Sequence, residues 1–115
     1  MKEETKEQKE ARIAEEKRIA ELFPRKEALK AIHGSAYGYS TDDGKKAYFK
    51  TPGLLILDAV KTRTGKSVMQ FNKLLAENCF LEGDREIIEK DEYLLGLFDW
   101  LPAIIEKKAG ELVKL

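Results

Sequence analysis

The chain has 115 residues, 43% of them apolar, and its 21 basic and 21 acidic side chains leave no formal net charge. A chain of this length can form a domain that removes roughly two thirds of its unfolded surface from water. The charge balance argues against a protein that binds nucleic acid or an anionic membrane, and no apolar run approaches the ~20 residues of a membrane span.

The first part of the chain, residues 2–21, has acids and bases in nearly every turn, separated by strong helix formers. Glu15 with Arg18, and Lys17 with Glu21, have the three- and four-residue spacings at which side chains meet on a helix. We therefore predict a charged helix whose first half is solvated. Such a helix is either a soluble arm or an arm that folds against a partner. The segment MKEETKEQKE is followed by no apolar run and does not have the pattern of a secretory signal.

The end of this arm is its apolar part, and we take Ile19, Leu22 and Phe23 as candidate partner-binding residues. Pro24 then interrupts the helix. The sequence RKEALKAIH predicts a short second helix that ends at Gly34, with His33 as an ordinary helix-end residue.

Residues 35–50, SAYGYSTDDGKKAYFK, change to aromatic and small side chains on either side of a turn signal. The dipeptide Asp43-Gly44 is typical of a β-hairpin. We predict strands near 36–40 and 45–50. Two strands alone are marginally stable, so helices are expected to cover them.

Two further helices are predicted after the hairpin. Thr51 is placed as the cap of the first, followed by Pro52 and GLLILDAVK, and a turn at 62–65 ends it. The second begins after Ser67 and has the apolar stripe Val68, Phe71, Leu74, Leu75 and Cys79. The FLEGD sequence that follows is interpreted as a break.

The connection contains Gly65-Lys66-Ser67, which resembles the end of a phosphate-binding loop. That loop requires a glycine five residues before Gly65, where this chain has Val60. We therefore interpret the segment as a turn in which Ser67 caps the next helix. Cys79 lies among apolar neighbours, which predicts a buried, inert thiol. With one cysteine and one histidine, no metal-site or cofactor-site spacing is present, and we expect a non-catalytic protein.

The last part, DEYLLGLFDWLPAIIEKKAGELVKL, is the most apolar. Asp91 is predicted to cap a helix with an apolar stripe that continues to Leu115. Pro102 predicts a kink, or a junction of two helices, near 99–101. Trp100 either fills the core beside the kink, the interpretation we favour, or serves with Phe98 as an anchor for a partner.

The predicted fold class is therefore α+β, mainly α: a small β-hairpin packed against a helical bundle, with a charged N-terminal helix. We predict an arm over residues 1–23 and a single compact domain over residues 24–115.

The order of these elements resembles that of tailed-phage and prophage tail assembly chaperones. The resemblance covers residues 45–115 and rests on four sequence landmarks. These are Lys50-Thr51-Pro52, the NCFLEGD sequence at 78–84, Asp91-Glu92-Tyr93 and Lys114-Leu115. It implies a small non-catalytic protein that binds and solubilises the tape-measure protein during tail assembly.

What the resemblance implies extends to partners and location. The expected partners are the tape-measure protein and the tail-tube protein, in the cytoplasm of the bacterial host, without nucleic acid, membrane or cofactor. Self-association is compatible with this role. The alternative is a small phage-encoded regulator or host-defence inhibitor that acts by protein–protein binding, and a third interpretation is an enzyme that uses the GKS loop.

Overall fold

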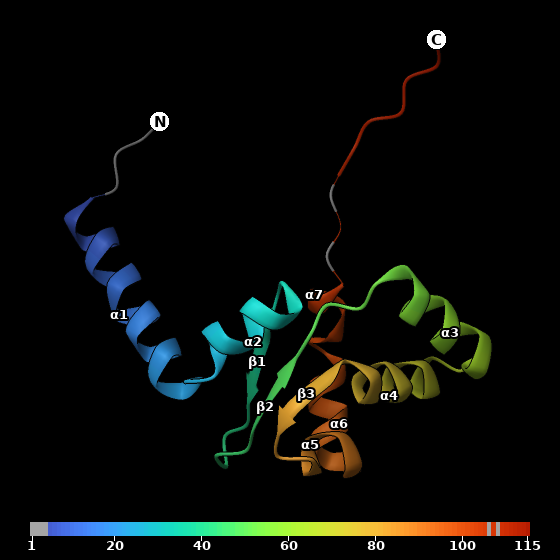
Figure 1. Ribbon diagram of the computed structural model, residues 1–115, viewed down its shortest axis with the longest axis horizontal. Coiled ribbons are helices and arrows are strands. Elements are labelled where there is room, and N and C mark those ends of the chain that lie inside the picture. Colours follow the sequence, from blue (N-terminus) through green and yellow to red (C-terminus); the bar gives the residue numbers. More distant parts are fainter. Residues whose placement is uncertain (1–4, 106, 108) are drawn as a thin grey trace. The chain divides into compact units, whose positions relative to one another are not determined.

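A computed structural model describes residues 5–105, 107 and 109–115. The chain divides into two compact units, Met1–Gly34 and Ser35–Leu115, which are described separately (Figure 1). The short second helix therefore belongs with the first helix and not with the strands, which differs from the predicted boundary after residue 23. The mainly helical α+β class is confirmed.

The N-terminal unit consists of α1 (Lys6–Leu22) and α2 (Lys26–His33). Thr5 caps α1 in a capping box with Gln8, which supplies partners to two backbone N–H groups of the helix start. The predicted pair of Glu15 and Arg18 forms, with 2.7 Å between Glu15 Oε1 and Arg18 Nη2. No residue of α1 is buried, which confirms a solvated first half.

The sheet of the second unit has three antiparallel strands in the order β1-β2-β3. The predicted hairpin is confirmed as β1 (Tyr37–Ser40) and β2 (Lys46–Phe49), joined by a turn in which Gly44 has a φ of 90°. The predicted break at FLEGD is wrong, because Phe80–Gly83 forms β3 along the other edge of β2. A four-residue strand that directly follows a helix has too few residues to show a period of two.

Two helices follow the hairpin, α3 (Leu54–Thr64) and α4 (Val68–Cys79), and they pack against each other. The predicted Ser67 cap is confirmed, since its side chain accepts a hydrogen bond from the Gln70 N–H. The predicted Thr51 cap is wrong: Gly53 occupies the cap position of α3. The Thr51 hydroxyl is instead 2.7 Å from the hydroxyl of Ser35, so a tertiary contact takes the group that would have capped the helix.

Three short helices end the unit: α5 (Glu86–Glu89), α6 (Asp91–Phe98) and α7 (Leu101–Ile104). Two helices meet at the predicted break before Pro102, but Asp91 is the first residue of α6 and the cap position belongs to Lys90. The predicted helix to Leu115 is wrong, because no described residue after Ile104 is helical. A short helix continues only when its apolar face packs against another element. Leu112 and Leu115 are fully exposed, so no such packing extends α7 toward them.

The core lies between β2 and the helices α3 to α7, which confirms that helices cover the hairpin. Its central members are Ala47, Phe49, Val60, Leu75, Ala76, Cys79, Ile87, Ile88, Leu94, Leu97, Leu101 and Ile104. Cys79 is completely buried, and burial raises the pKa of its thiol to about 11. A thiol that stays protonated is a poor nucleophile, in agreement with the predicted inert cysteine.

A hydrogen bond joins the hairpin turn to α6. The Tyr93 hydroxyl donates to a carboxylate oxygen of Asp43 over 2.5 Å. Hydrogen bonds from Thr41 and then Tyr93 hold the pKa of Asp43 below its ordinary value. The same bond to Asp43 raises the pKa of Tyr93 to about 12. Each group is therefore stabilised in the protonation state that keeps this bond.

Tyr93→Phe is expected to lower the thermal midpoint at pH 7. It should also remove the part of the stability that depends on the protonation of Asp43 and Tyr93. Because the folded-state pKa of Asp43 is lowered, its stabilisation exists above the unfolded-state pKa and is lost as pH falls through the folded value. Because the pKa of Tyr93 is raised, its contribution exists below pH ~10 and is lost as pH rises toward about 12. The difference between the wild-type and variant midpoints should therefore shrink at both ends, as measured by thermal melts from pH 2.5 to 11.

Tyr39→Phe is the matched control on the acid side, because Tyr39 is also partly buried and packs against the core of this unit, whereas the hydrogen bond to Asp43 comes from Tyr93. If the thermal midpoints of wild type and Tyr93→Phe differ by the same amount from pH 2.5 to 7, the assigned hydrogen bond is contradicted.

Candidate protein-binding groove

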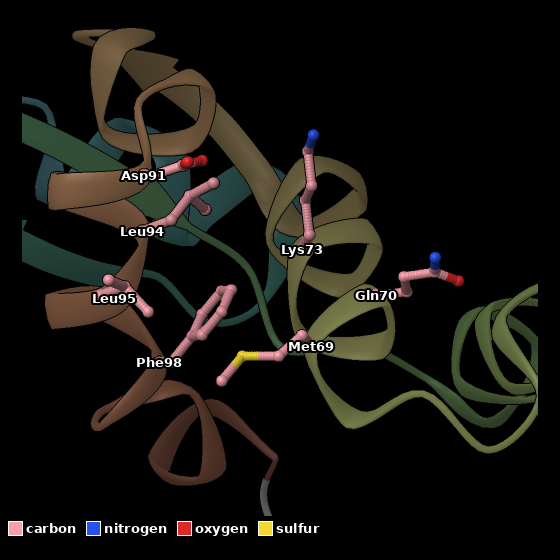
Figure 2. Close-up of a pocket in the computed structure, with 7 residues that line it drawn as sticks. All are labelled: Met69, Gln70, Lys73, Asp91, Leu94, Leu95 and Phe98. Atoms are coloured by element: carbon pink, nitrogen blue, oxygen red, sulfur yellow. The ribbon is translucent and has the colours of Figure 1, made fainter.

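A groove opens between α4 and α6, and Figure 2 shows the side chains around it. Its cavity has a volume of about 310 Å³. The lining side chains come from one face of each helix: Met69, Gln70 and Lys73 on α4, and Asp91, Leu94, Leu95 and Phe98 on α6. Helical spacing of three and four residues places them in two facing rows.

The groove is apolar because α6 contacts the core with only part of its apolar surface. Leu94 is 3% exposed and forms the floor, whereas the next residue, Leu95, is turned about 100° around the helix and is 55% exposed. Met69, at the start of α4, is 61% exposed and points toward Phe98 (Figure 2). A flexible thioether opposite leucine and phenylalanine can adapt to apolar side chains of different shapes.

Two of the three polar lining residues lie toward the end of the groove away from Phe98. Lys73 on α4 and Asp91 on α6 are both exposed and lie toward the same end in Figure 2. Neither side chain has an ion pair within the described part of the chain. One positive and one negative charge beside an apolar surface can pair with a partner segment that carries both signs.

The two predicted anchors near the kink have different environments. Phe98 is partly buried and lines the groove. Trp100 is 64% exposed, so the favoured interpretation as a core residue is wrong. Trp100 lies in the two-residue turn between α6 and α7, where the change of chain direction turns its ring toward a separate cavity of about 120 Å³ beside β1.

The other three candidate residues lie in the N-terminal unit. Ile19 and Leu22 are partly buried, and Phe23 is buried at 9% exposure. Phe23 borders a cavity between α1 and α2, which Lys26 and Glu27 also line. The structure thus brings Phe98 and Trp100 into one unit and these three residues into the other.

Sequence reasoning missed Met69 and Leu95, the two most exposed apolar side chains of the groove. Val68 was assigned to the core stripe of α4, although it is 69% exposed and adjoins Met69. Two consecutive apolar residues at a helix start cannot both lie on a narrow apolar stripe. The Val68-Met69 pair therefore indicated that at least one of the two side chains is exposed.

The GKS segment joins two helices, α3 and α4, as the favoured interpretation predicted. A phosphate-binding loop instead follows a strand. Val60 is 2% exposed inside α3 and Gly65 ends that helix with a φ of 59°. Among the residues with described positions, no helix is long and apolar enough to cross a membrane, and no cluster of three or more His, Cys, Asp or Glu side chains could hold a metal ion.

Comparisons of the chain with protein-family models, with curated proteins and with solved structures gave no match.

Proposed function

We propose that the protein is a non-catalytic tail assembly chaperone that binds the tape-measure protein of its own phage through the α4–α6 groove. The supporting observation is an apolar groove whose rim residues Met69 and Leu95 are more than half exposed. The resemblance over residues 45–115 supplies the identity of the partner.

The shape and chemistry of the groove are suited to an amphipathic helix. Apolar residues at every third or fourth position of such a helix can contact Leu95, Met69 and Phe98 in turn. A tape-measure protein is long and helical, with apolar faces that would associate with each other when unshielded. Coverage by many copies, each binding weakly, would keep it soluble and still allow its release to tail-tube subunits.

The balanced charge of the chain supports the same role. Twenty-one basic and 21 acidic residues make a highly charged outer surface without a field that would attract nucleic acid. The expected location is the cytoplasm of the bacterial host, where tails are assembled.

Co-expression with the tape-measure protein encoded in the same genome tests this proposal. The tape-measure protein is expected to be insoluble alone, and soluble and co-purified with this chain. Met69→Asp with Leu95→Asp should abolish the effect, because two carboxylates would then have to be buried in an apolar contact.

The matched control is Leu54→Asp with Leu55→Asp, which changes two α3 side chains that are 85% and 88% exposed and do not line the groove. This variant should still solubilise the tape-measure protein. Failure of the wild-type chain to change its solubility would reject the chaperone function, and a regulator of host proteins would become the better hypothesis. Equal loss in both variants would reject the groove as the binding surface.

A further inference from the structure

Three apolar side chains after α7 have no cover in the structure. Leu112 is 101% exposed, Val113 61% and Leu115 113%, and all three lie in the non-helical segment at 109–115. Single exposed leucines are common, but three exposed apolar residues within four positions are a local concentration of apolar side chains. This segment belongs to the same compact unit as the groove.

The segment and the groove have complementary chemistry. The groove offers an apolar floor with Lys73 and Asp91 toward one end. The segment has its apolar residues between and beside one acid, Glu111, and one base, Lys114. The groove and the segment thus each carry one positive and one negative side chain, and none of the four has an ion pair within the described residues.

We propose that residues 110–115 act as a strap that closes into the α4–α6 groove of the same chain and that a bound partner displaces. The inference rests on the proposed function, because the strap and the tape-measure protein would compete for one groove.

The length of the chain permits this closure. Seven residues lead from Ile105, at the end of α7, to Leu112, and a fully extended chain of that length reaches about 24 Å. The groove follows α6, whose eight residues span about 12 Å. The reach of this linker is therefore about twice the length of the helix that lines the groove.

A tethered strap explains how an exposed apolar groove is compatible with a soluble subunit. Tethering gives the strap an effective concentration of the order of millimolar, so weak binding is enough to cover the groove. Closure would bury the apolar surfaces of strap and groove together, and a partner with a longer apolar face would replace the strap.

Met69 provides a direct probe, because Met1 and Met69 are the only methionines of the chain. With ¹³C-methyl-labelled methionine, Leu112→Ser with Leu115→Ser is expected to shift the Met69 methyl resonance and leave that of Met1 unchanged. The matched control Leu54→Ser with Leu55→Ser changes two equally exposed leucines outside the groove and should shift neither resonance. A Met69 resonance that is the same in wild type and strap variant would overturn the proposal.

Disulfide trapping distinguishes a strap in the same chain from one donated by a second copy. Leu95→Cys with Leu112→Cys should form a monomeric disulfide at least tenfold faster than Leu55→Cys with Leu112→Cys. Cys79 is completely buried and should not interfere. A disulfide-linked dimer, or equal rates for the two pairs, would reject closure within one chain.

Both measurements use the protein without its partner, so their failure would leave the chaperone proposal intact. If the strap is confirmed, the Leu112→Ser, Leu115→Ser variant should bind the tape-measure protein several-fold more tightly than wild type. A confirmed strap combined with an unchanged, insoluble tape-measure protein would reject the proposed function alone.

Discussion

Gly83→Ala is expected to destabilise the second unit by about 3 kcal/mol or more, the sum of a backbone cost of about 1–3 kcal/mol and a steric overlap. Gly83 ends β3 with a φ of 127°, a conformation that side chains with a Cβ rarely adopt. A Cβ built there would lie 2.4 Å from the carbonyl oxygen of Lys46 and 2.7 Å from Cα of Ala47. Both are backbone atoms of the central strand, so β3 would have to separate from β2.

Gly44→Ala is the control that isolates the backbone cost. Gly44 also has a positive φ, 90°, but a Cβ there would meet no atom within 4 Å. Urea unfolding should therefore give a clearly larger loss for Gly83→Ala than for Gly44→Ala. Equal losses would mean that β3 does not approach β2 as closely as the structure shows.

Phe49→Ala is expected to cost about 3–5 kcal/mol, because it leaves a large cavity in the core. Phe49 is 1% exposed on the central strand. Its ring packs edge-on against Phe80 of β3, with 5.9 Å between ring centroids and an interplanar angle of 80°. The substitution thus removes both buried area and the aromatic contact that joins the sheet edge to the core.

Leu54→Ala is the comparison for Phe49→Ala, since Leu54 is 85% exposed and its truncation should change stability by less than about 0.5 kcal/mol. Thermal or urea unfolding of the two variants measures the difference. A small loss for Phe49→Ala would show that the core is not centred on β2.

The contrast between the two glycines and the two apolar residues shows which features a sequence can predict. Asp43-Gly44 indicated its own turn, because a hairpin turn needs a residue with positive φ, and glycine meets this need within the turn itself. Nothing adjacent to Gly83 indicated a strand, since its need for glycine comes from Lys46 and Ala47, far away in the chain. The apolar run that contains Leu54 and Leu55 likewise predicted a helix correctly but could not show that these two leucines face solvent.

The candidate groove was predictable only in part. Phe98 was identified because the apolar stripe around Pro102 was dense, whereas Met69 and Leu95 were not. Their exposure depends on the distance between α4 and α6, both of which contact α5. Trp100 was assigned to the core because large aromatic residues usually lie there, but the turn between α6 and α7 leaves it exposed.

The sequence by itself determined the helices α1 and α2, the hairpin, the Ser67 cap and the break before Pro102, because caps, turn residues and proline act within a few positions of the chain. The tertiary structure alone decided the third strand, the displaced start of α3, the end of the last helix at Ile104 and the groove between α4 and α6. Each of these depends on contacts between segments distant in the chain: β3 exists because β2 offers an unpaired edge, and Thr51 does not cap α3 because Ser35 lies beside it.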